Sequence, residues 1–531
     1  MKRCPECGRE YDNSMMFCLD DGAELLYGPA NDASKLPKNE PLTVLLRDAV
    51  PLSEARTPPQ RGLSTDLERK KERSIAVLPF SNLSPDPQDE FFCDGLAEEL
   101  LGSLARIDGL KVASRTSAFS FKGKDAKVAE IARALAVTFI LEGSVRRSAD
   151  KLRINVQLID AANDRPVWSQ RYDRELKDIF DVQDEIALSV VDALKVKLLG
   201  VQRSALLKRY TDNPLAYELF LKGRFHWYKH TPEDVRKSLG YFQETIALDP
   251  DYAPGHAGLA EFYGISSALS LMDPSQGWPL AERSLKRALE LDDAIPEIHN
   301  GLAAVKGIFY RDARGAELEL QRAMELNPRF AEAHSLRSFL LVAQGRFDEA
   351  IEEASKALIL DPLSTSYQRY LGWWFYFARN FDEAIVRYRM IIKSHPDVSR
   401  VHMDLRDALL QTGRKAEAVE AWRQEAINTA DGEMILALGS PETADEVLAR
   451  GAKLELERLE KRLGSGEWVA PVEFARSYVR LGDYRNAVSW LERASEVRDC
   501  FSLLMPYDPF YDLLRHDPRF EHIAPRNNVT Q

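Results

Sequence analysis

Four side chains near the amino terminus have the types and the spacing of a metal site. Cys4 and Cys7 are separated by two residues and followed by a glycine, and Cys18 and Asp21 repeat that arrangement. Thiolates and carboxylates are ligands of tetrahedral zinc, and a glycine after each pair lets the backbone turn tightly around the ion. The spacing therefore predicts that Cys4, Cys7, Cys18 and Asp21 bind one structural zinc ion.

Two questions about this segment stay open at the level of sequence. Asp20 is a rival to Asp21 for the fourth ligand position, although only Asp21 copies the spacing of the first pair. Residues 1–27 resemble half of a zinc ribbon, so zinc would supply most of the folding energy of so short a segment. Nothing nearby predicts the cavity of a catalytic zinc, so we expect a structural site. The alternative is that the cysteines are free thiols on an unstructured tail.

The longest part of the chain, residues 213–525, is built on a repeat. Its most regular members are four alanines spaced 34 residues apart, namely Ala316, Ala350, Ala384 and Ala418. Small side chains let two helices approach closely. A proline that recurs with the same period ends the second helix of each unit. This pattern resembles the tetratricopeptide repeat (TPR), whose unit is two antiparallel helices. It implies an all-α superhelical solenoid with a terminal cap.

Five aromatic residues follow one another within this repeat, from Trp373 to Phe377. A helix cannot direct five consecutive side chains to one face, so some are expected to point into the concave groove of the solenoid. Trp373, Trp374 and Tyr376 are therefore candidate anchors for a protein or peptide partner, because aromatic anchors dominate many interfaces. The alternative is that these rings fill the interfaces between neighbouring repeats.

Residues 74–200 predict a different architecture. Short apolar runs and amphipathic stretches follow the order β-α-β-α-β-β-β-α, which indicates one mixed sheet with helices packed on it. The phrases IAVLPFSNL from Ile75, DGLAEEL from Asp94, FSFKG from Phe119 and LEGSVR from Leu141 resemble the TolB amino-terminal-like domain. In bacterial chains of this type the domain is often followed by TPRs. It is often preceded by a winged helix, a protein kinase or a class III cyclase, so the resemblance implies a regulatory or assembly protein.

Several residues of this segment have the chemistry of catalysis, but none stands in a complete motif. Asp94, Glu98 and Glu99 are clustered carboxylates, and their simpler interpretation is the acidic first turn of a helix. The Lys-Gly-Lys run from Lys122 lacks the upstream glycine of a phosphate-binding loop. Cys93 is more simply a buried apolar side chain than a reactive thiol. We therefore expect no enzymatic activity.

Composition and charge limit the remaining possibilities. The 531 residues are 45% hydrophobic and 29% charged with a net charge of −12, which is ordinary for a soluble chain and argues against nucleic acid as the main partner. No run approaches the roughly 18 apolar residues of a membrane helix, and no signal peptide is evident, so we expect a cytoplasmic location. The predicted domains are a zinc-ribbon-like segment (1–27), a flexible proline-rich linker (28–73), an α/β domain (74–200) and a TPR solenoid (213–525).

These features together predict an interaction scaffold or adaptor whose TPR groove binds a protein or peptide in regulation or complex assembly. The alternative is a transcriptional or signalling regulator whose zinc ribbon contacts nucleic acid or a polymerase-like partner. Three basic residues face six acidic ones in the first 27 positions, which favours the scaffold over the nucleic-acid binder. Structural zinc is the expected cofactor.

Overall fold

The computed structural model describes residues 2–3, 10–11, 26–27, 73–196, 198, 203–204, 206–229, 231–398, 400–439 and 442–524. The chain divides into two compact units, Met1–Lys70 and Lys71–Gln531. In the first unit, β1 (Lys2–Arg3), β2 (Glu10–Tyr11) and β3 (Leu26–Tyr27) form a small antiparallel sheet of order β2-β1-β3. The predicted zinc ligands Cys4, Cys7, Cys18 and Asp21 lie outside the described residues.

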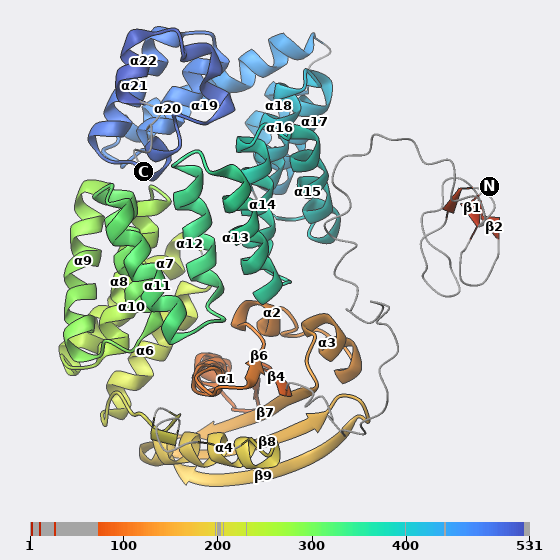
Figure 1. The fold of residues 1–531 in the computed structure, drawn as a ribbon, viewed down its shortest axis with the longest axis vertical. Coiled ribbons are helices and arrows are strands. Elements are labelled where there is room, and N and C mark those ends of the chain that lie inside the picture. The colour runs from red at the N-terminus through yellow and green to blue at the C-terminus, as the bar shows by residue number, and fades with distance from the viewer. Residues whose placement is uncertain are drawn as a thin grey trace, which may run out of the picture. The chain divides into compact units, whose positions relative to one another are not determined.

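The second unit begins with a mixed sheet of order β6-β4-β7-β8-β9. Its strands are β4 (Arg73–Val77), β5 (Ser81–Asn82), β6 (Leu110–Val112), β7 (Phe139–Ser148), β8 (Lys151–Asp160) and β9 (Arg165–Glu175). β4 runs parallel to β6 and β7, whereas β7, β8 and β9 are antiparallel neighbours (Figure 1). The short β5 pairs with β7. The predicted order of strands and helices is confirmed with two additions, the short β5 and α2, and β8 and β9 form a hairpin.

Helices cover both faces of this sheet. α1 (Glu90–Ala105) and α4 (Ile179–Ala193) share one apolar cluster with Ile75 and Val77 of β4. α2 (Arg115–Phe119) and α3 (Val128–Leu135) share another cluster with Ala76 and Leu78. Successive side chains of a strand point to opposite faces, so the near-continuous apolar run of β4 supplies both layers. Single turns of 3-10 helix precede α1 and α4, at η2 (Pro87–Asp89) and η3 (Leu176–Asp178).

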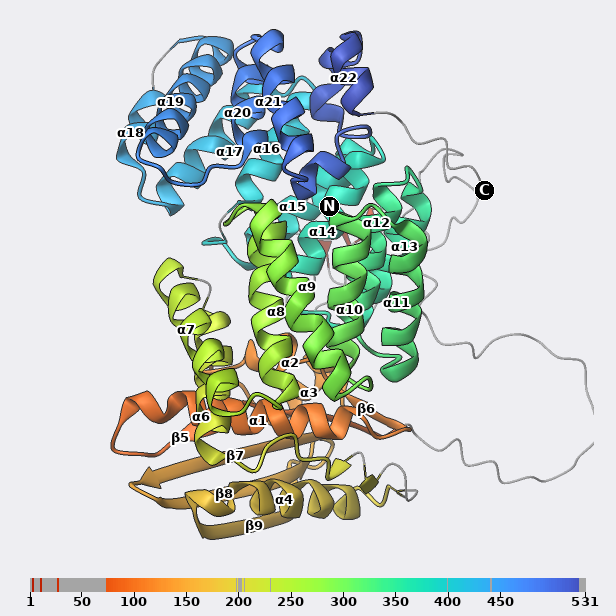
Figure 2. The same cartoon turned by 90° about the vertical axis from the view of Figure 1, so that its left-hand side faces the viewer.

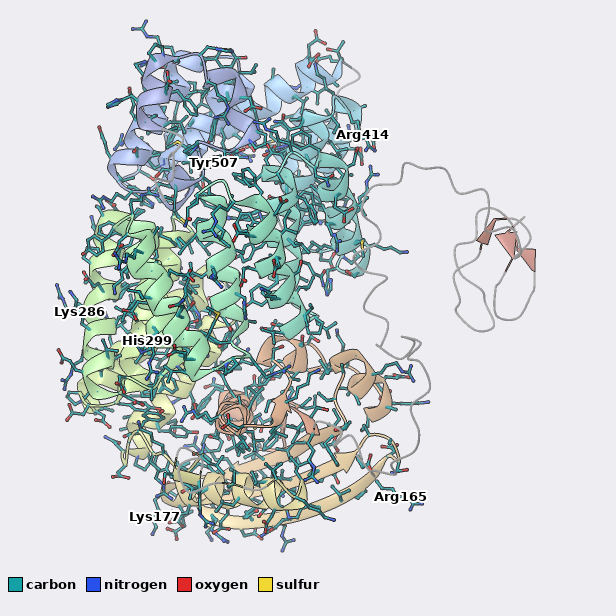
Figure 3. The ribbon with its side chains drawn as sticks, viewed as in Figure 1. Arg165, Lys177, Lys286, His299, Arg414 and Tyr507 are labelled. Atoms are coloured by element: carbon teal, nitrogen blue, oxygen red, sulfur yellow. The ribbon has the colours of Figure 1, made fainter. Side chains whose placement is uncertain are left out.

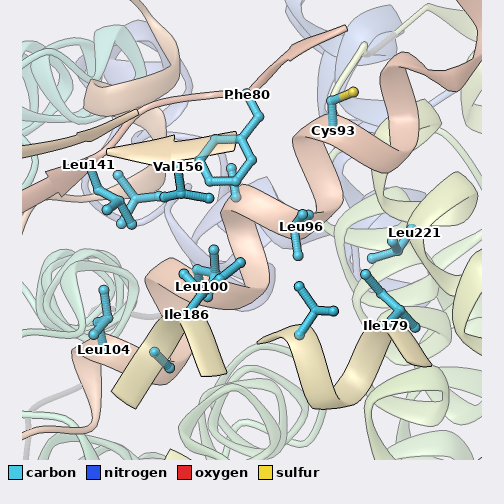
Figure 4. Close-up of a cluster of buried hydrophobic side chains, with 14 of the residues drawn as sticks. Phe80, Cys93, Leu96, Leu100, Leu104, Leu141, Val156, Ile179, Ile186 and Leu221 are labelled. Atoms are coloured by element: carbon cyan, nitrogen blue, oxygen red, sulfur yellow. The ribbon is translucent and has the colours of Figure 1, made fainter. Parts of the chain in front are cut away.

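The first of these clusters is also where the α/β domain meets the solenoid. Leu96 and Leu100 of α1 lie among Ile179 and Ile186 of α4, and Leu221 lies beside them (Figure 4). Leu221 belongs to the first solenoid helix, and a Cβ atom added at Gly95 would lie 2.7 Å from its side chain. Because only glycine permits that approach, Gly95 lets α1 pack directly against the solenoid.

Cys93 lies in the same apolar cluster (Figure 4). Its side chain is fully buried, and burial raises the pKa of its thiol to about 12. A thiol with so high a pKa stays protonated at neutral pH and is a poor nucleophile. This confirms the interpretation of Cys93 as a buried apolar side chain.

Antiparallel helix pairs follow from residue 214 and stack into a superhelix (Figure 2). The pairs are α6 (Pro214–Trp227) and α7 (Pro232–Leu248); α8 (Ala253–Ala268) and α9 (Pro274–Leu291); α10 (Pro296–Ala304), extended by the π-helical η4 (Val305–Phe309), and α11 (Ala313–Leu326); α12 (Ala331–Val342) and α13 (Phe347–Leu360); α14 (Thr365–Phe377) and α15 (Phe381–Ser394); α16 (Val401–Gln411) and α17 (Lys415–Asn428); α18 (Gly432–Ala437) and α19 (Ala444–Gly464); α20 (Pro471–Arg480) and α21 (Tyr484–Glu496). Ala316, Ala350, Ala384 and Ala418 are fully buried, as the close packing of paired helices requires.

The turn inside each regular pair has a left-handed residue at the same repeat position. Arg311, Gly345, Arg379 and Gly413 are 34 residues apart and have φ angles of 61°, 76°, 64° and 74°. Glycine adopts this conformation readily, whereas an L-residue with a side chain is disfavoured there. Glycine stands at two of the four turns, where the first helix of the pair ends. The two arginines therefore need a compensating interaction.

The last residues of the solenoid supply that interaction. η5 (Cys500–Leu503), η6 (Pro509–Leu514) and α22 (Pro518–Ile523) follow α21. In the stretch predicted as a terminal cap, Phe520 of α22 and Val488 of α21 share one apolar cluster. The same stretch, however, also returns to the turns of much earlier repeats. We call residues 498–515 the C-terminal segment.

Candidate partner-binding surface

The aromatic run of α14 is largely internal. Trp374 is 1% exposed, and its Nε1 donates a hydrogen bond to Ser338 Oγ at 2.9 Å. Tyr376 is 6% exposed, and its ring packs edge-on against Phe381. The interpretation of Trp374 and Tyr376 as anchors in an open groove therefore needs correction. Both rings fill contacts within and between neighbouring repeats, because burying so much aromatic surface stabilises the stacking.

Trp373, the third proposed anchor, is half-buried and already has partners within the chain. The Arg369 guanidinium lies 4.7 Å from the centre of its ring, and the Phe501 ring lies 6.1 Å away with edge-on geometry. Phe501 belongs to the C-terminal segment. Trp373, which was predicted to anchor a partner, thus contacts the C-terminal segment of the same chain.

The C-terminal segment runs along the turns of three successive helix pairs, and Tyr507 marks its course at the boundary with the earlier repeats (Figure 3). The three contacts are Arg311 Nη2 with Ser502 Oγ at 2.8 Å, the Phe347 and Tyr507 rings at 5.7 Å, and Arg379 with both carboxylate oxygens of Asp512 at 2.5 and 2.8 Å. Both left-handed arginines thus use their side chains to hold this segment. One edge of the superhelix is thereby covered by the chain itself.

The α/β domain covers part of the opposite edge, where one pair connects to the next. Asp361, between α13 and α14, accepts hydrogen bonds from Ser114 Oγ at 2.6 Å and from Ser117 Oγ. The backbone N–H of Leu363 donates to Ser117 Oγ at 3.0 Å, and Leu363 packs against the apolar cluster around α2 and α3. The α/β domain therefore contacts the solenoid at its fourth and fifth helix pairs as well as at α6.

Glu98 of α1 is the centre of an ion-pair network at this junction. Its carboxylate lies 2.7 Å from Arg115 Nε and 2.6 Å from Arg224 Nη2, and Arg224 also contacts Glu261 of α8 at 2.7 Å. Burial opposes ionisation of Glu98, but Arg224 and Arg115 outweigh that cost and lower its pKa to about 2. The interpretation of Glu98 as part of a helix first turn is wrong, because α1 begins at Glu90. Its carboxylate instead joins two domains.

Glu99, the next residue, is compensated less, because Arg106 and Arg224 lower its pKa only in part. Among the described residues no cation pairs with it, and burial, together with the charge of Glu98, raises its pKa to about 7. Glu297 of α10 and Glu332 of α12 are solvent-exposed carboxylates that also lack a paired cation within the described part of the chain. Partial desolvation by the surrounding protein raises the pKa of Glu332, and the nearby charge of Glu297 raises it further.

Glu99, Glu297 and Glu332, together with the Arg224-paired Glu261, are close enough for their charges to act on one another, and we call these four carboxylates the acidic surface. It extends over α1 and the first helices of three successive pairs, α8, α10 and α12. Glu99 is half-buried whereas Glu332 is exposed, so water screens Glu332 and Glu99 carries the greater electrostatic cost. A surface with several uncompensated carboxylates is suited to bind cationic groups. Its four described side chains include no nucleophile and base in hydrogen-bonding contact.

The sequence did not single out Glu297 and Glu332. Each is the second residue of its helix, where an acidic side chain is common because it complements the helix dipole. Only the stacking of α8, α10 and α12 shows that these carboxylates share a surface. Their matching position, as the second residue of the first helix in successive pairs, is the signal in the sequence that indicates them.

Comparison with protein families identifies two parts of the chain. Residues 70–188 match the model described as HilA/YgeH-like transcriptional regulator, second domain. Residues 311–365 and 371–433 match a tetratricopeptide repeat model, which confirms the TPR prediction. The matched regulator domain coincides with the α/β domain described above.

Two curated proteins resemble the chain over part of its length. A protein of Rhizobium meliloti (strain 1021) named "Putative adenylate cyclase 3" is 34% identical over 258 residues, which cover 48% of this chain and 43% of the relative. The human protein named DnaJ homolog subfamily C member 7 is 24% identical over 221 residues, which cover 39% of this chain and 41% of the relative. The chain thus spans less than half the length of either relative.

Solved structures of helical-repeat proteins also resemble the chain. Yeast Tom70 aligns with 65% of this chain and 82% of its own, at 14% identity and a TM-score of 0.38. A thermophilic TPR protein of Thermus thermophilus aligns with 37% of this chain and 99% of its own, at 18% identity and a TM-score of 0.32.

The Rhizobium meliloti relative corrects one expectation from the sequence. The absence of a complete catalytic motif led us to expect no enzymatic activity, yet a protein 34% identical over 258 residues is named as a cyclase. That expectation is contradicted. A separate finding concerns membranes: within the described residues, no helix combines the length and the apolar character that crossing a bilayer requires.

Proposed function

We propose that this chain is a regulatory protein that binds a protein partner through its TPR superhelix. TPR proteins in general mediate interactions between proteins, and the TPR assignment of residues 311–433 is the basis of the proposal. The C-terminal segment and the α/β domain each cover one edge of the superhelix. The acidic surface has exposed carboxylates without a paired cation among the described residues, so we place the partner there.

The partner's chemistry follows from the carboxylates. Glu297 and Glu332 are exposed and have no paired cation among the described residues, and this observation carries the proposal. A segment rich in lysine or arginine would supply the missing positive charge to several helices at once. The partner we propose is therefore a protein that presents an extended basic segment.

The test uses the full chain and a fluorescein-labelled peptide of alternating lysine and alanine. Fluorescence anisotropy would compare the wild type with a double variant, Glu297→Gln with Glu332→Gln. We expect the Kd to rise about tenfold, because the two lost charge pairs together contribute on the order of 1.4 kcal/mol.

A control must separate this surface from the general negative charge of the chain. Glu233→Gln with Glu457→Gln removes the same charge from two exposed positions elsewhere, whose side chains are 73% and 58% exposed. The control variant should bind the peptide within about twofold of wild type. Equal weakening in both double variants would refute the proposal.

A second candidate role is regulation in transcription or cyclase-linked signalling. The HilA/YgeH-like match over residues 70–188 and the cyclase name of the Rhizobium meliloti relative favour it. The TolB amino-terminal-like resemblance points to the same class of regulator. Two measurements on the purified chain test this role: formation of cyclic AMP from ATP, and retention on duplex DNA as a function of salt. A positive result in either would assign the corresponding activity.

The zinc site stays a proposal of its own. Cys4, Cys7 and Cys18, with Asp21, have the ligand types and spacing of a structural zinc centre. Metal analysis of the purified chain should find one zinc per molecule, and Cys7→Ser should remove it. Retention of zinc in Asp21→Asn but not in Asp20→Asn would show that Asp20 is the fourth ligand.

A further inference from the structure

The α/β domain has a topological switch point. β6 and β7 flank β4 on opposite sides, so the chain leaves β4 toward one side of the sheet and later returns on the other. The connecting helices α1 and α3 lie on opposite faces of the sheet. In open α/β sheets, ligands bind in the crevice that such a switch opens beyond the carboxyl ends of the strands.

A cavity lies at this place. Its volume is 710 Å³, within the range of about 300–1,000 Å³ typical of small-molecule sites. Leu78 and Pro79, directly after β4, form its base, and the loop between α2 and α3 forms one wall. The polar strand face of β7, β8 and β9 forms the other wall, with Ser144, Asn155 and Gln157 as neutral hydrogen-bonding groups.

Lysines of the α2–α3 loop differ in what they contact. Lys122 is held by two carboxylates of α1, Glu90 at 2.7 Å and Asp94 at 2.6 Å, and it ties the loop to that helix. Lys124 also lines the cavity, but its Nζ contacts only the Phe121 ring, at 5.9 Å from the centre, among the described residues. Lys124 is therefore the cation available to a ligand.

On the strand wall a carboxylate is available. Glu142 of β7 is half-buried and lines the cavity. Its Oε1 accepts a hydrogen bond of 2.5 Å from the neutral amide of Gln157, and no cation pairs with it in the described part of the chain. A half-buried carboxylate with only an amide partner gains from contact with a cation.

We infer that this cavity binds a zwitterionic ligand of the short-peptide class. Its carboxylate would meet Lys124, its ammonium group would meet Glu142, and its peptide groups would meet the amides and hydroxyls between them. Of the four charged lining residues, Glu90 and Lys122 pair with each other, which leaves one charge of each sign. A purely anionic ligand would satisfy Lys124 but bring negative charge toward Glu142, so the charge pattern favours a ligand with both signs.

The inference is tested with tri-alanine in three forms and the full chain. Isothermal titration calorimetry would measure binding of tri-alanine with free termini, of N-acetyl-tri-alanine and of tri-alanine amide. We expect the free peptide to bind and each blocked form to bind at least about tenfold more weakly. No binding of the free peptide at millimolar concentration, or equal binding of all three forms, would overturn the inference.

Two variants assign the ends of the ligand. Lys124→Met should weaken the free peptide to the level of its amide, and Glu142→Gln should weaken it to the level of the acetylated form. Two control variants should leave binding unchanged. Lys127→Met removes a positive charge as Lys124→Met does, and Asp125→Asn removes a negative charge as Glu142→Gln does, but neither residue lines the cavity. Thermal unfolding would confirm that each variant is folded. If the controls weaken binding as much as the test variants do, the cavity is not the site.

This site and the acidic surface can fail separately. The cavity belongs to the α/β domain, and its test reads the charges at the two ends of a short zwitterionic peptide. The proposed function concerns carboxylates on α10 and α12 and a polycationic probe. A negative result in one of the two binding experiments does not contradict the other proposal.

Discussion

Two charged regions of the second unit differ in how completely their charges are paired. Around Asp407 of α16, Arg406 and Arg476 each lie 2.9 Å from the carboxylate, and Arg480 lies 3.4 Å away. Burial opposes ionisation there, but the three guanidinium groups lower the Asp407 pKa well below its usual range. On the acidic surface, burial raises the pKa of Glu99, and the described residues offer no paired cation.

The difference separates charges that stabilise the fold from charges to which we assign a partner in our proposal. The arginines of the Asp407 cluster are themselves supported, since Arg406 lies over the Trp422 ring at 4.4 Å and Arg476 lies over the Phe510 ring at 4.3 Å. Phe510 is part of the C-terminal segment, so this cluster joins the two ends of the later solenoid. A buried carboxylate shared by several cations specifies structure, whereas a carboxylate without a paired cation costs stability that a ligand can restore.

The largest expected effect is at the paired region. Asp407→Ala would leave three arginines without their shared carboxylate, and we expect the free energy of unfolding to fall by about 3–5 kcal/mol. Urea denaturation followed by circular dichroism would measure it. Asp445→Ala removes a carboxylate whose side chain is 70% exposed beside Lys415, and should cost at most about 1 kcal/mol. Similar losses in both variants would show that the Asp407 network contributes no more than a surface pair.

A smaller effect is expected where the C-terminal segment covers a turn. Gly413→Ala introduces a side chain at φ 74° with open space around it, so only backbone strain of about 1–2 kcal/mol is expected. Gly345→Ala adds the same strain at φ 76° and also places a Cβ atom 2.8 Å from the Tyr507 ring. We expect Gly345→Ala to lose about 1 kcal/mol more than Gly413→Ala in the same denaturation experiment. Equal losses would mean that Tyr507 does not pack on this turn in solution.

The smallest effect tests the unpaired region. An acid whose pKa is higher in the folded than in the unfolded chain stabilises the fold at low pH and loses that contribution as pH rises through the folded pKa. For Glu99 this loss spans pH 4.5, its ordinary pKa, to about 7. Glu99→Gln removes this cost. At pH 8 the substitution should therefore raise the Tm by about 2 °C more than it does at pH 5. Differential scanning calorimetry at the two pH values would measure the difference.

The control for that measurement is Glu460→Gln, an exposed carboxylate on α19. Its substitution should change the Tm equally at both pH values. A pH-independent effect of Glu99→Gln would show that the Glu99 carboxylate is compensated in the folded chain. The contrast between the two regions would then disappear.

Local pattern was enough to predict most of the secondary structure. Local pattern specifies α3 at Val128–Leu135, because its apolar stripe and its flanking residues agree on those bounds. The amphipathic pattern that starts at Asp178 continues to Leu199, whereas α4 ends at Ala193. The irregular stretch 430–466 contains α18 and the 21-residue α19, whose length follows from its capping box at Thr443 and its helix-favouring composition.

Site residues were harder to predict, and the reason is the same in each case. Trp374 and Glu98 have side chains suited either to a partner or to the chain itself, and their spacing does not say which. Trp374 donates a hydrogen bond to Ser338, which lies 36 residues away in the chain. Arg224 pairs with Glu98, which lies 126 residues away. Contacts over such separations depend on how whole helices stack.

By itself the sequence determined the repeat and the strands, because the 34-residue period and the alternation of apolar side chains are properties of neighbouring residues. It also specified the left-handed turns at Gly345 and Gly413, where glycine alone is unstrained. The tertiary structure decided which charges are paired and which are exposed to a ligand. Arg379 forms an ion pair with Asp512, whereas Lys124 forms none with a carboxylate among the described residues. Both outcomes depend on how distant segments pack, because the free energy of a charge depends on its neighbours.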